Sequence, residues 1–388
     1  MTAQARAQEG SPRMALWKAL LLTLPASLFS FATLLQVLFL ADNPPFILII
    51  AALLVGTVLT VLFFLMVRTG KTHRYRSALF ILMAAALPLH FLPMMFREYG
   101  TNMLTDAAAY SGKAQFCPLT MPMVLLPAVL GKGAIFPGML TMGATWFLMW
   151  VGASLSTGRG WCSWGCFYGG FDEFFSRLRK KATIKHVDRK WTFLSFGILL
   201  AIVLISAIAF HPFYCEWLCP FKAVTEFNAP TSAATIAALV IFVTLFLGLV
   251  VALPLLTKKR IQCAIWCPFG AMQSFFNKIN IFEVRIDLDK CTQCKRCLRE
   301  CPTFSLDEGS VVNGKALMSC TKCGHCVDAC PKGAMSYHIK GTPVGVRPNV
   351  ARLLFIYAAY VLVGFLGGNI MTDAVQNVFK WITTGSMI

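Results

Sequence analysis

The sequence predicts an α-helical multispan membrane protein of about seven transmembrane helices, with a small α+β domain inserted before the last helix. Of its 388 residues, 57% are hydrophobic and only 13% are charged, and the mean hydropathy is +0.66. Several apolar runs reach the ~20 residues that a helix needs to cross a bilayer. A cysteine-rich stretch, residues 291–330, interrupts this pattern shortly before the final run. A membrane part at residues 1–280, a small domain at 281–340 and a last helix with its tail at 341–388 follow from these observations.

Seven apolar runs are the expected membrane helices. The first is longer than the hydrophobic part of a typical signal peptide and no convincing cleavage site follows it, so we expect it to be retained. Residues 121–137 are apolar but broken by prolines and glycines, which predicts irregular structure buried in protein. Residues 370–388 are expected to form a short amphipathic tail. The runs are 20–40, 46–67, 78–95, 138–155, 193–210, 233–256 and 353–366.

The net charge of +18 is spread over loops between the apolar runs and does not gather on one face or arm. This distribution is the positive-inside pattern of membrane proteins and argues against a nucleic-acid partner. It predicts that the N-terminus and residues 68–76, 157–191 and 257–349 are cytoplasmic. Residues 96–137 and 211–232 are then expected on the outer side.

The pattern Cys-x2-Cys-x2-Cys-x3-Cys-Pro occurs twice, beginning at Cys291 and at Cys320. It is typical of bacterial ferredoxins with two [4Fe–4S] clusters, in which the fourth cysteine of each copy ligates the other cluster. Structural zinc and a disulfide framework are the alternatives, and neither usually shows this duplicated triplet. An Asn-Gly pair at 313–314 predicts a tight hairpin between the two halves. The predicted ligands are Cys291, Cys294, Cys297 and Cys330 for cluster 1, and Cys320, Cys323, Cys326 and Cys301 for cluster 2.

A second pattern, Cys-x3-Cys, occurs three times with similar aromatic and small flanking residues. One such pair could be ordinary packing by a small apolar residue, but three matching pairs favour a redox role. Counting one crossing between successive pairs puts the first and third on the cytoplasmic side, where they supply four thiolates for a further cluster. The middle pair and Cys117 would form an outer redox centre or a disulfide. The pairs are Cys162 and Cys166, Cys215 and Cys219, and Cys263 and Cys267.

Over residues 158–331 these motifs resemble those of membrane-bound polyferredoxins of the NapH and NosR type, which are related to CcoG-type proteins. Phe167 departs from the proline that usually follows the second cysteine. The resemblance implies a bacterial inner-membrane protein that passes electrons between cytoplasmic clusters, the quinone pool and a cytoplasmic or periplasmic redox protein. It also implies the membrane redox subunit of a quinol dehydrogenase or of a ferredoxin-type oxidoreductase.

Weaker features allow an alternative function, a copper-reducing or metal-handling assembly factor. Soft thioether ligands suit Cu(I), although methionine is also a common gap filler in helix packing. His90 and His211 could contact a haem or a quinone carbonyl, but a hydrogen-bonded interfacial histidine is the simpler interpretation. The methionines concerned are Met94, Met95, Met103, Met121, Met123, Met139 and Met142.

Overall fold

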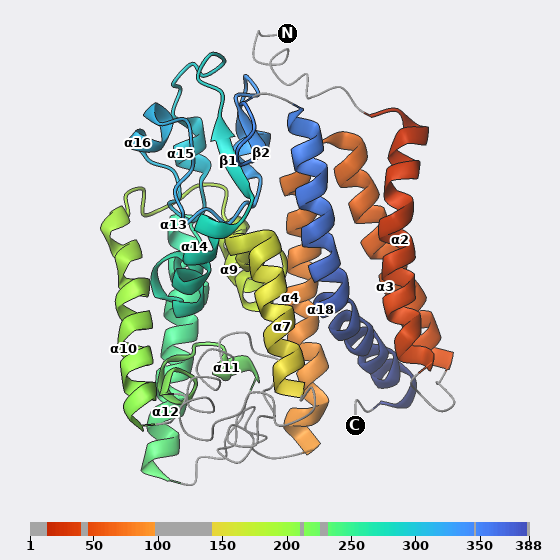
Figure 1. Cartoon of the computed structure of the whole chain (residues 1–388). Helices are drawn as coiled ribbons and strands as arrows, with labels where there is room; N and C mark the ends of the chain where they lie inside the picture. The colour runs from red at the N-terminus through yellow and green to blue at the C-terminus, as the bar shows by residue number, and fades with distance from the viewer. Residues whose placement is uncertain are drawn as a thin grey trace.

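The computed structural model describes residues 14–39, 46–97, 142–209, 213–225, 232–344 and 347–385. These residues form a bundle of long helices that carries a small domain with two strands at one end (Figure 1). The irregular segment predicted at 121–137 lies outside the described residues.

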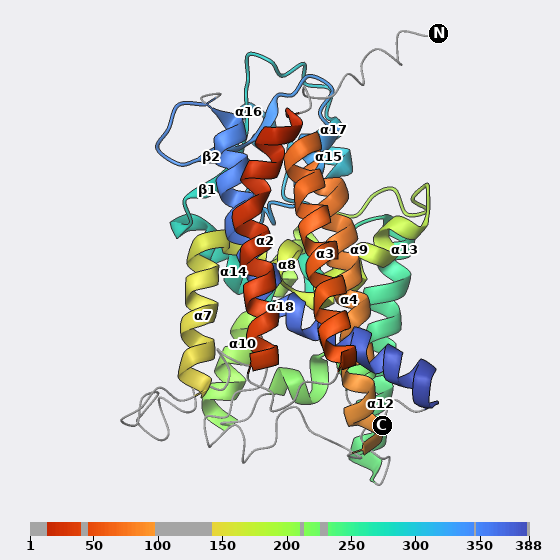
Figure 2. The same ribbon diagram turned by 90° about the vertical axis from the view of Figure 1, so that its right-hand side faces the viewer.

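Four helices pack side by side in one half of the bundle (Figures 1 and 2). Their shared core contains Leu59 and Phe63 of α3 together with Phe355 and Tyr360 of α18. The Tyr360 hydroxyl also shares a 2.6 Å hydrogen bond with Ser30 of α2, which satisfies a polar group within this apolar interior. The helices are α2 (Leu16–Phe39), α3 (Phe46–Thr69), α4 (Thr72–Arg97) and α18 (Pro348–Thr384).

The other half of the bundle combines long helices with short ones. One continuous helical stretch, Ala233–Thr257, contains a π-helical segment at Phe246–Ala252 immediately before Pro254. Two short helices, α9 and α14, follow the first and third cysteine pairs and are amphipathic. The elements are α7 (Met142–Thr157), α8 (Trp161–Trp164), α9 (Phe167–Leu178), α10 (Leu194–Ala209), α11 (Lys222–Thr225), α12 (Ala233–Leu245), α13 (Leu253–Thr257) and α14 (Pro268–Ile279).

The small domain is closed by two antiparallel strands, β1 (Phe282–Ile286) and β2 (Met335–Ile339), with Phe282 opposite Ile339. Between them lie the short helices α15 (Arg296–Glu300), α16 (Glu308–Val312) and α17 (His325–Ala329). The predicted hairpin at the Asn-Gly pair is wrong. Asp307 and Ser310 form a capping box that starts α16, and Gly314 (φ 67°) only turns the chain after that helix.

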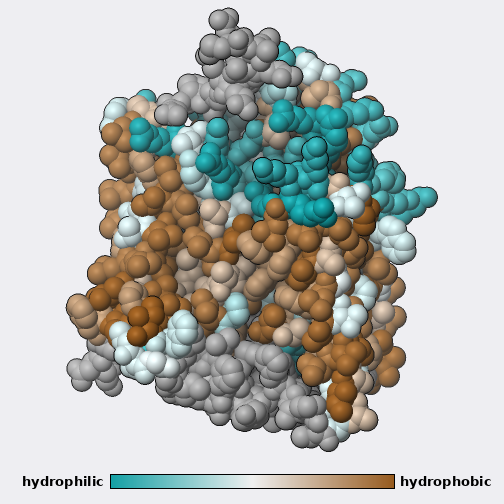
Figure 3. All heavy atoms as spheres, turned by 180° about the vertical axis from the view of Figure 1, so that it is seen from behind, coloured by the Kyte–Doolittle hydropathy of each residue, from teal (hydrophilic) through white to brown (hydrophobic). Residues whose placement is uncertain are grey.

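Four described helices are long and apolar enough to cross a membrane, namely Leu16–Leu35, Phe46–Thr69, Ala233–Thr257 and Pro348–Thr384. Figure 3 shows hydrophobic residues over the helices and hydrophilic residues concentrated at the end that carries the small domain. The described parts of α7 and α10 cover 16 residues each and border residues outside the described ranges. The structure therefore supports a helical membrane protein, while the number of crossings stays a prediction.

Two predicted boundaries are wrong. The loop predicted at 68–76 is reduced to Gly70 and Lys71, because α3 ends at Thr69 and α4 begins at Thr72. The seventh helix does not end at 366 but continues to Thr384, so there is no separate amphipathic tail before Gly385. A Cβ at Gly367 would clash with Met83 Sδ of α4, which shows how closely α18 packs there. Tertiary packing therefore carries α18 through a glycine pair that the sequence favours as an end.

Candidate functional site

The two cysteine triplets of the small domain lie on loops with the same backbone shape. Gln293 and Lys295 in the first loop have φ of 52° and 54°, and Lys322 and Gly324 at the equivalent positions have φ of 50° and 78°. Left-handed residues of this kind turn successive peptide N–H groups toward one concave side, which suits an anionic group. Each loop leads into a short helix, α15 or α17, whose C-cap is the fourth cysteine of the copy.

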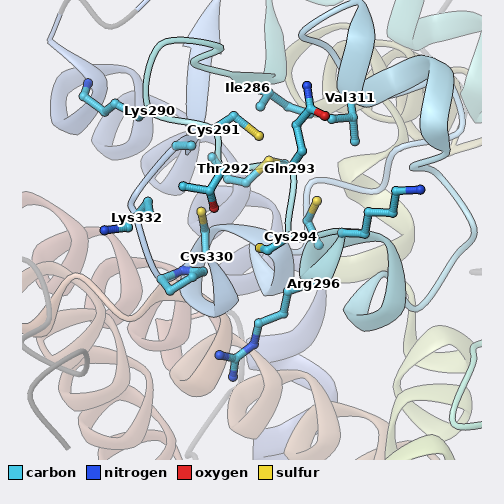
Figure 4. A pocket seen from close by; sticks show the side chains of 15 residues that line it. Ile286, Lys290, Cys291, Thr292, Gln293, Cys294, Arg296, Val311, Cys330 and Lys332 are labelled. Atoms are coloured by element: carbon cyan, nitrogen blue, oxygen red, sulfur yellow. The ribbon is translucent and has the colours of Figure 1, made fainter. Parts of the chain in front are cut away.

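The first triplet shares a cavity with the fourth cysteine of the other copy. Cys291, Cys294 and Cys297 line this cavity together with Cys330. Figure 4 shows the sulfur atoms of Cys291, Cys294 and Cys330 turned toward the same space. Cys294 is exposed, and basic side chains, including Arg296 and Lys332, stand at the rim (Figure 4).

The second triplet lines a separate cavity with Cys301, the fourth cysteine of the first copy. Cys320, Cys323 and Cys326 belong to this cavity, and Cys301, Cys323 and Cys326 are buried. The Ser305 backbone N–H donates to Cys301 Sγ at 3.3 Å, a contact of the kind that tunes iron–sulfur potentials. Burial raises the pKa of the Cys320 thiol to about 12, so binding of a metal group here must release thiol protons.

Neither cavity resembles a site for a single ion. Among the described residues, no group of three or more His, Cys, Asp and Glu side chains is arranged so that it could hold one metal ion. Zinc needs its ligands within about 2.0–2.3 Å of one centre, whereas a cubane separates its thiolates over a larger core. The duplicated triplet with a crossed fourth cysteine is the arrangement of a two-cluster ferredoxin rather than of structural zinc.

The Cys-x3-Cys pairs share one local structure. The residues before the second cysteine form an α-helical or π-helical turn, and the second cysteine is extended, with φ, ψ of −89°, 110° at Cys166, −81°, 110° at Cys219 and −70°, 115° at Cys267. A short helix begins just beyond each of them, α9, α11 or α14. The internal repeat predicted from the spacing is therefore also a repeat of backbone structure.

The first and third pairs are joined by two equivalent arginines. Arg159 lies three residues before Cys162, and Arg260 lies three residues before Cys263. Arg159 Nη2 donates to the Cys263 carbonyl at 3.0 Å, and Arg260 Nη2 donates to the Cys162 carbonyl at 2.7 Å. The two repeats are thus clasped by reciprocal hydrogen bonds.

Two equivalent glycines make room for these two arginines. A Cβ at Gly169 of α9 would lie 2.5 Å from the Cys162 carbonyl oxygen and 2.5 Å from Arg260 Nη2. A Cβ at Gly270 of α14 would lie 2.8 Å from the Cys263 carbonyl oxygen and 3.2 Å from an Arg159 nitrogen. Each glycine comes seven residues after the first cysteine of its pair, and no larger residue would leave room for the arginine.

The surroundings of this clasp are buried and charged. Arg159 and Arg260 are 1% and 0% exposed. Arg260 Nη2 also donates to Cys263 Sγ at 3.1 Å, and the Cys263 N–H donates to Asp172 at 2.9 Å. Arg260 further lies 3.7 Å from Glu173. The site can therefore place positive charge directly beside a sulfur atom while the guanidinium keeps acidic partners.

Glu173 also ties the site to α4. Its carboxylate accepts from Arg76 at 2.7 Å and from Ser77 at 3.0 Å, both on α4. Arg76 Nη1 donates in turn to the Ser163 carbonyl at 2.6 Å. Buried ion pairs of this kind require good geometry, and this one fixes α4, α8 and α9 relative to one another.

The second cavity of the small domain lies against the first repeat. The Trp164 indole N–H donates to the Lys322 carbonyl at 3.3 Å, and Lys322 Nζ donates to the Thr157 carbonyl at 3.1 Å and to Asn277 Oδ1 at 2.5 Å. Asn277 Nδ2 donates to the Cys320 carbonyl at 2.8 Å, and its Oδ1 also accepts from the Arg159 N–H. Burial is the largest effect on Lys322 and lowers its pKa to about 7.

The third repeat touches the same cavity from the other side. The Arg260 N–H donates to the Pro302 carbonyl at 2.8 Å, and Lys259 Nζ donates to the Cys301 carbonyl at 2.7 Å. A few side chains and peptide groups therefore connect the second cavity with Cys162 and Cys263.

The crossing count predicts that the middle cysteine pair lies on the other side of the membrane from the first and third pairs. In the structure the middle pair instead lies close to them. Cys219 is buried in the same apolar cluster as Cys162, with Cys166 and Cys267 packed against it. The Trp266 indole N–H donates to the Leu218 carbonyl at 3.3 Å, so the second and third repeats are in direct contact. Figure 1 draws α11 above the lower ends of α10 and α12, which shows that the segment folds back into the bundle. The side chains of Cys117 and Cys215, His211, and the side chains of the methionines considered for copper lie outside the described residues.

The cysteine patterns identify the sulfur atoms but not the residues that join them. Arg159 and Arg260, Gly169 and Gly270, and the bridging Asn277 have no motif of their own. An alignment of the first and third repeats would have paired the two arginines at the same offset from cysteine, which is a detectable signal.

Comparison with protein families matches two descriptions. A 4Fe-4S dicluster domain matches residues 283–331. A 4Fe-4S binding domain matches three times, at residues 139–185, 191–233 and 229–286, and each match contains one Cys-x3-Cys pair. No solved structure matches the chain.

Among curated proteins, the ferredoxin-type protein NapH of Haemophilus influenzae is 25% identical over 186 residues, covering 48% of this chain and 61% of that protein. The putative electron transport protein YccM of Escherichia coli is 26% identical over 168 residues, which cover 39% of this chain and 43% of that protein. An uncharacterised protein of Methanocaldococcus jannaschii is 25% identical over 153 residues, which cover 37% of this chain and 52% of that protein. The matches span about half the length of these relatives. Together with the domain matches they confirm the resemblance to polyferredoxins of the NapH type.

Proposed function

We propose that this protein is an iron–sulfur electron-transport protein of the bacterial inner membrane. Two [4Fe–4S] clusters in the small domain would exchange electrons with a thiol-ligated centre in the helical part, and this centre with quinone or a periplasmic redox protein. The family matches and the names of the relatives support iron–sulfur chemistry and electron transport. The clusters would supply one-electron redox chemistry, and the protein would bind, orient and insulate them.

The observation that carries the proposal is the reciprocal clasp of Arg159 and Arg260 around the first and third cysteine pairs. Two hydrogen bonds between equivalent residues bring Cys162, Cys166, Cys263 and Cys267 into one buried region. Four thiolates and an iron–sulfur core carry net negative charge, which is costly to bury without positive partners. Two guanidinium groups with almost no exposure supply that charge from within the same two repeats.

The two crossed cysteine sets of the small domain have different surroundings, which suggests an order for electron transfer. The set of Cys301, Cys320, Cys323 and Cys326 contacts both clasped repeats through Lys322, Asn277 and Arg260. The set of Cys291, Cys294, Cys297 and Cys330 has the exposed Cys294 on its open side. Cluster 2 would therefore face the membrane centre, and cluster 1 would exchange electrons with a soluble carrier.

The proposed arrangement in the membrane has seven crossings, with the N-terminus and the small domain cytoplasmic. The small domain lies at the hydrophilic end of the bundle (Figure 3). The positive-inside pattern of the loops supports a cytoplasmic location for this end. Because the middle repeat folds back toward the other two, Cys215 and Cys219 would extend the membrane centre toward the outer half of the bundle. Cys117 stays a candidate ligand of that outer centre.

Metal analysis of anaerobically purified protein tests the proposal. Two clusters in the small domain and one between the repeats predict about twelve iron atoms per chain, since each cubane holds four. Reduced protein should give the electron paramagnetic resonance signals of interacting [4Fe–4S] clusters. Stoichiometric zinc or copper without iron would contradict electron transfer and favour a metal-handling role instead.

A further inference from the structure

A cavity of about 240 Å³ lies among α2, α3, α4 and α18, outside the cysteine sites. Its walls include Leu48 and Ala52 of α3 and Phe91 of α4, and its polar side chains include His90 of α4 and Asp373 of α18. His90 is eighteen residues beyond Thr72, where α4 begins beside the small domain, which is about 27 Å along a helix. The cavity therefore lies toward the end of the bundle opposite the small domain.

The shape of α18 accounts for the space. Figures 1 and 2 show that the C-terminal part of α18 runs at an angle to its first part. Gly367 and Gly368 lie in this helix immediately before the residues that line the cavity, and sharp bends in helices usually occur at such residues. A Cβ at Gly368 would lie 3.2 Å from Leu34 Cδ2, so α18 is in close contact with α2 at this point. Beyond it, the helices enclose the cavity.

The polar end of the cavity holds a histidine beside a carboxylate, and an unsatisfied amide. His90 Nδ1 lies 3.2 Å from Asp373 Oδ2, and the His90 side chain is 15% exposed. Asn369 Oδ1 is buried and has no hydrogen-bond partner among the described residues. An apolar cavity with a few converging polar groups is the usual form of a small-molecule site. A neutral imidazole can donate a hydrogen bond to a ligand oxygen or accept one from a ligand hydroxyl.

We propose that this cavity binds the head group of a lipid-soluble quinone or quinol, with one ring oxygen at His90. The inference rests on the proposed electron-transport function and locates the site of its lipid-soluble partner. Apolar walls suit a quinone ring, whereas a simple lipid tail would gain nothing from the His90–Asp373 pair. A haem would need a larger space and a second axial ligand, and His90 is the one histidine among the described residues of the lining.

The proposed reaction at this site is the oxidation of a quinol. A quinol loses two protons and two electrons to become a quinone. His90 accepts the first proton from the ring hydroxyl, and the second leaves to water. The electrons pass one at a time to an oxidised iron–sulfur centre of the protein. α4, which carries His90, also packs against α11 beside Cys219, and so connects the cavity with the region of the cysteine repeats.

Photolabelling tests binding independently of electron transfer. Full-length protein in nanodiscs is illuminated with an azidoquinone, digested and mapped by mass spectrometry, with excess decylubiquinone as competitor. We expect competitor-sensitive labels within Leu48–Leu53 of α3, Leu87–Phe91 of α4 or Asn369–Asp373 of α18. Competitor-sensitive labels on helices other than α2, α3, α4 and α18, or labels that the competitor does not reduce, would overturn the proposal.

Two variants with a matched control test the reaction. Ala52→Phe fills the cavity, and Leu53→Phe adds a similar ring at the neighbouring position, which is 48% exposed. His90→Asn keeps a polar side chain but removes the proton acceptor. His90→Asn should slow cluster reduction by decylubiquinol about 100-fold, the size of a general-base contribution. Ala52→Phe should slow it by excluding the quinol from the cavity, and both variants should leave reduction by dithionite unchanged. The Leu53→Phe control should keep the wild-type rate.

The outcomes separate this inference from the proposed function. A wild-type rate in His90→Asn would overturn the quinone site, as would a wild-type protein whose clusters are reduced by dithionite but never by quinol. In both cases the iron–sulfur clusters would remain. Loss of iron in the wild-type preparation would instead contradict the proposed function itself.

Discussion

Arg260 donates a 2.7 Å hydrogen bond to the carbonyl oxygen of Cys162, although about a hundred residues separate them in the chain. The same guanidinium donates to the Ser163 hydroxyl and to Cys263 Sγ. Arg159 makes the matching contact with the Cys263 carbonyl. Two repeats that begin as similar stretches of sequence are therefore held together as a pair, with a cationic group at each end.

Replacing Arg260 tests whether this clasp supports a cluster. Arg260→Gln removes the buried charge beside Cys263 and leaves Glu173 with fewer partners, so we expect loss of about four iron atoms per chain, one cubane. Arg260→Lys keeps the charge but not the planar fork, and should lose less iron. Arg179→Gln, on an exposed arginine, is the control and should keep all its iron. Full iron content in Arg260→Gln would show that the clasp is not needed for cluster binding.

Variants of the fourth cysteines test the crossed ligand sets of the small domain. Cys301 shares a cavity with Cys320, Cys323 and Cys326, so Cys301→Ser should remove the same cluster as Cys323→Ser. The double variant Cys301→Ser/Cys323→Ser should therefore lose no more than about four iron atoms. Combining Cys301→Ser with Cys294→Ser should remove both clusters, about eight iron atoms. The reverse pattern of losses would mean that each copy of the motif binds its own cluster.

The sequence predicted the helical membrane architecture and the separate cysteine-rich domain, because apolar length and cysteine spacing are local properties. The predicted runs before the domain overlap the six long described helical stretches, although α4 begins at Thr72, six residues before its predicted start at 78. The sequence prediction failed where a local signal was overruled by packing. The Asn-Gly turn follows α16 instead of joining two strands, because β1 pairs with β2 across the whole domain.

Sequence periodicity could not predict how the three repeats meet. A count of crossings assumes that each loop stays at its membrane face, whereas Trp266 of the third repeat reaches Leu218 of the second. Buried hydrogen bonds such as that between Lys322 and Asn277 could not be predicted either, because neither residue belongs to a recognisable motif. The sequence predicts the chemistry of this protein better than the arrangement of its repeats, since cysteine motifs specify their chemistry directly.

Removing single membrane cysteines tests the third centre. Cys162→Ser should remove about four iron atoms and one electron paramagnetic resonance component without affecting the two clusters of the small domain. Cys219 lies in the same apolar cluster, so Cys219→Ser reports whether the middle pair contributes to that centre. If Cys162→Ser keeps all its iron and its spectrum, the repeated spacing serves helix packing only.

Reporter fusions test the orientation. Gly70 and Lys71 form the short connection between α3 and α4 at the end of the bundle near the small domain, since the His73 N–H donates to Asp328 there. A fluorescent protein fused after Lys71 should therefore be fluorescent in the cytoplasm, and alkaline phosphatase fused there should be inactive. Active phosphatase at this position would invert every side that we assign.

Asn277 tests the connection between cluster 2 and the membrane centre. Its side chain accepts from Lys322 Nζ and the Arg159 N–H and donates to the Cys320 carbonyl, so one amide joins both sites. Asn277→Leu leaves buried donors unpaired and should destabilise the protein by about 2–4 kcal/mol, measured as a shift of the denaturation midpoint. Adding Lys322→Met removes the buried amine that the first change deprives of Asn277 Oδ1. The double variant should therefore recover part of the loss, since a buried polar pair can be replaced by apolar residues at little cost. Strictly additive losses would mean that the Asn277–Lys322 contact does not contribute to stability, and that the two sites are held together by their other contacts.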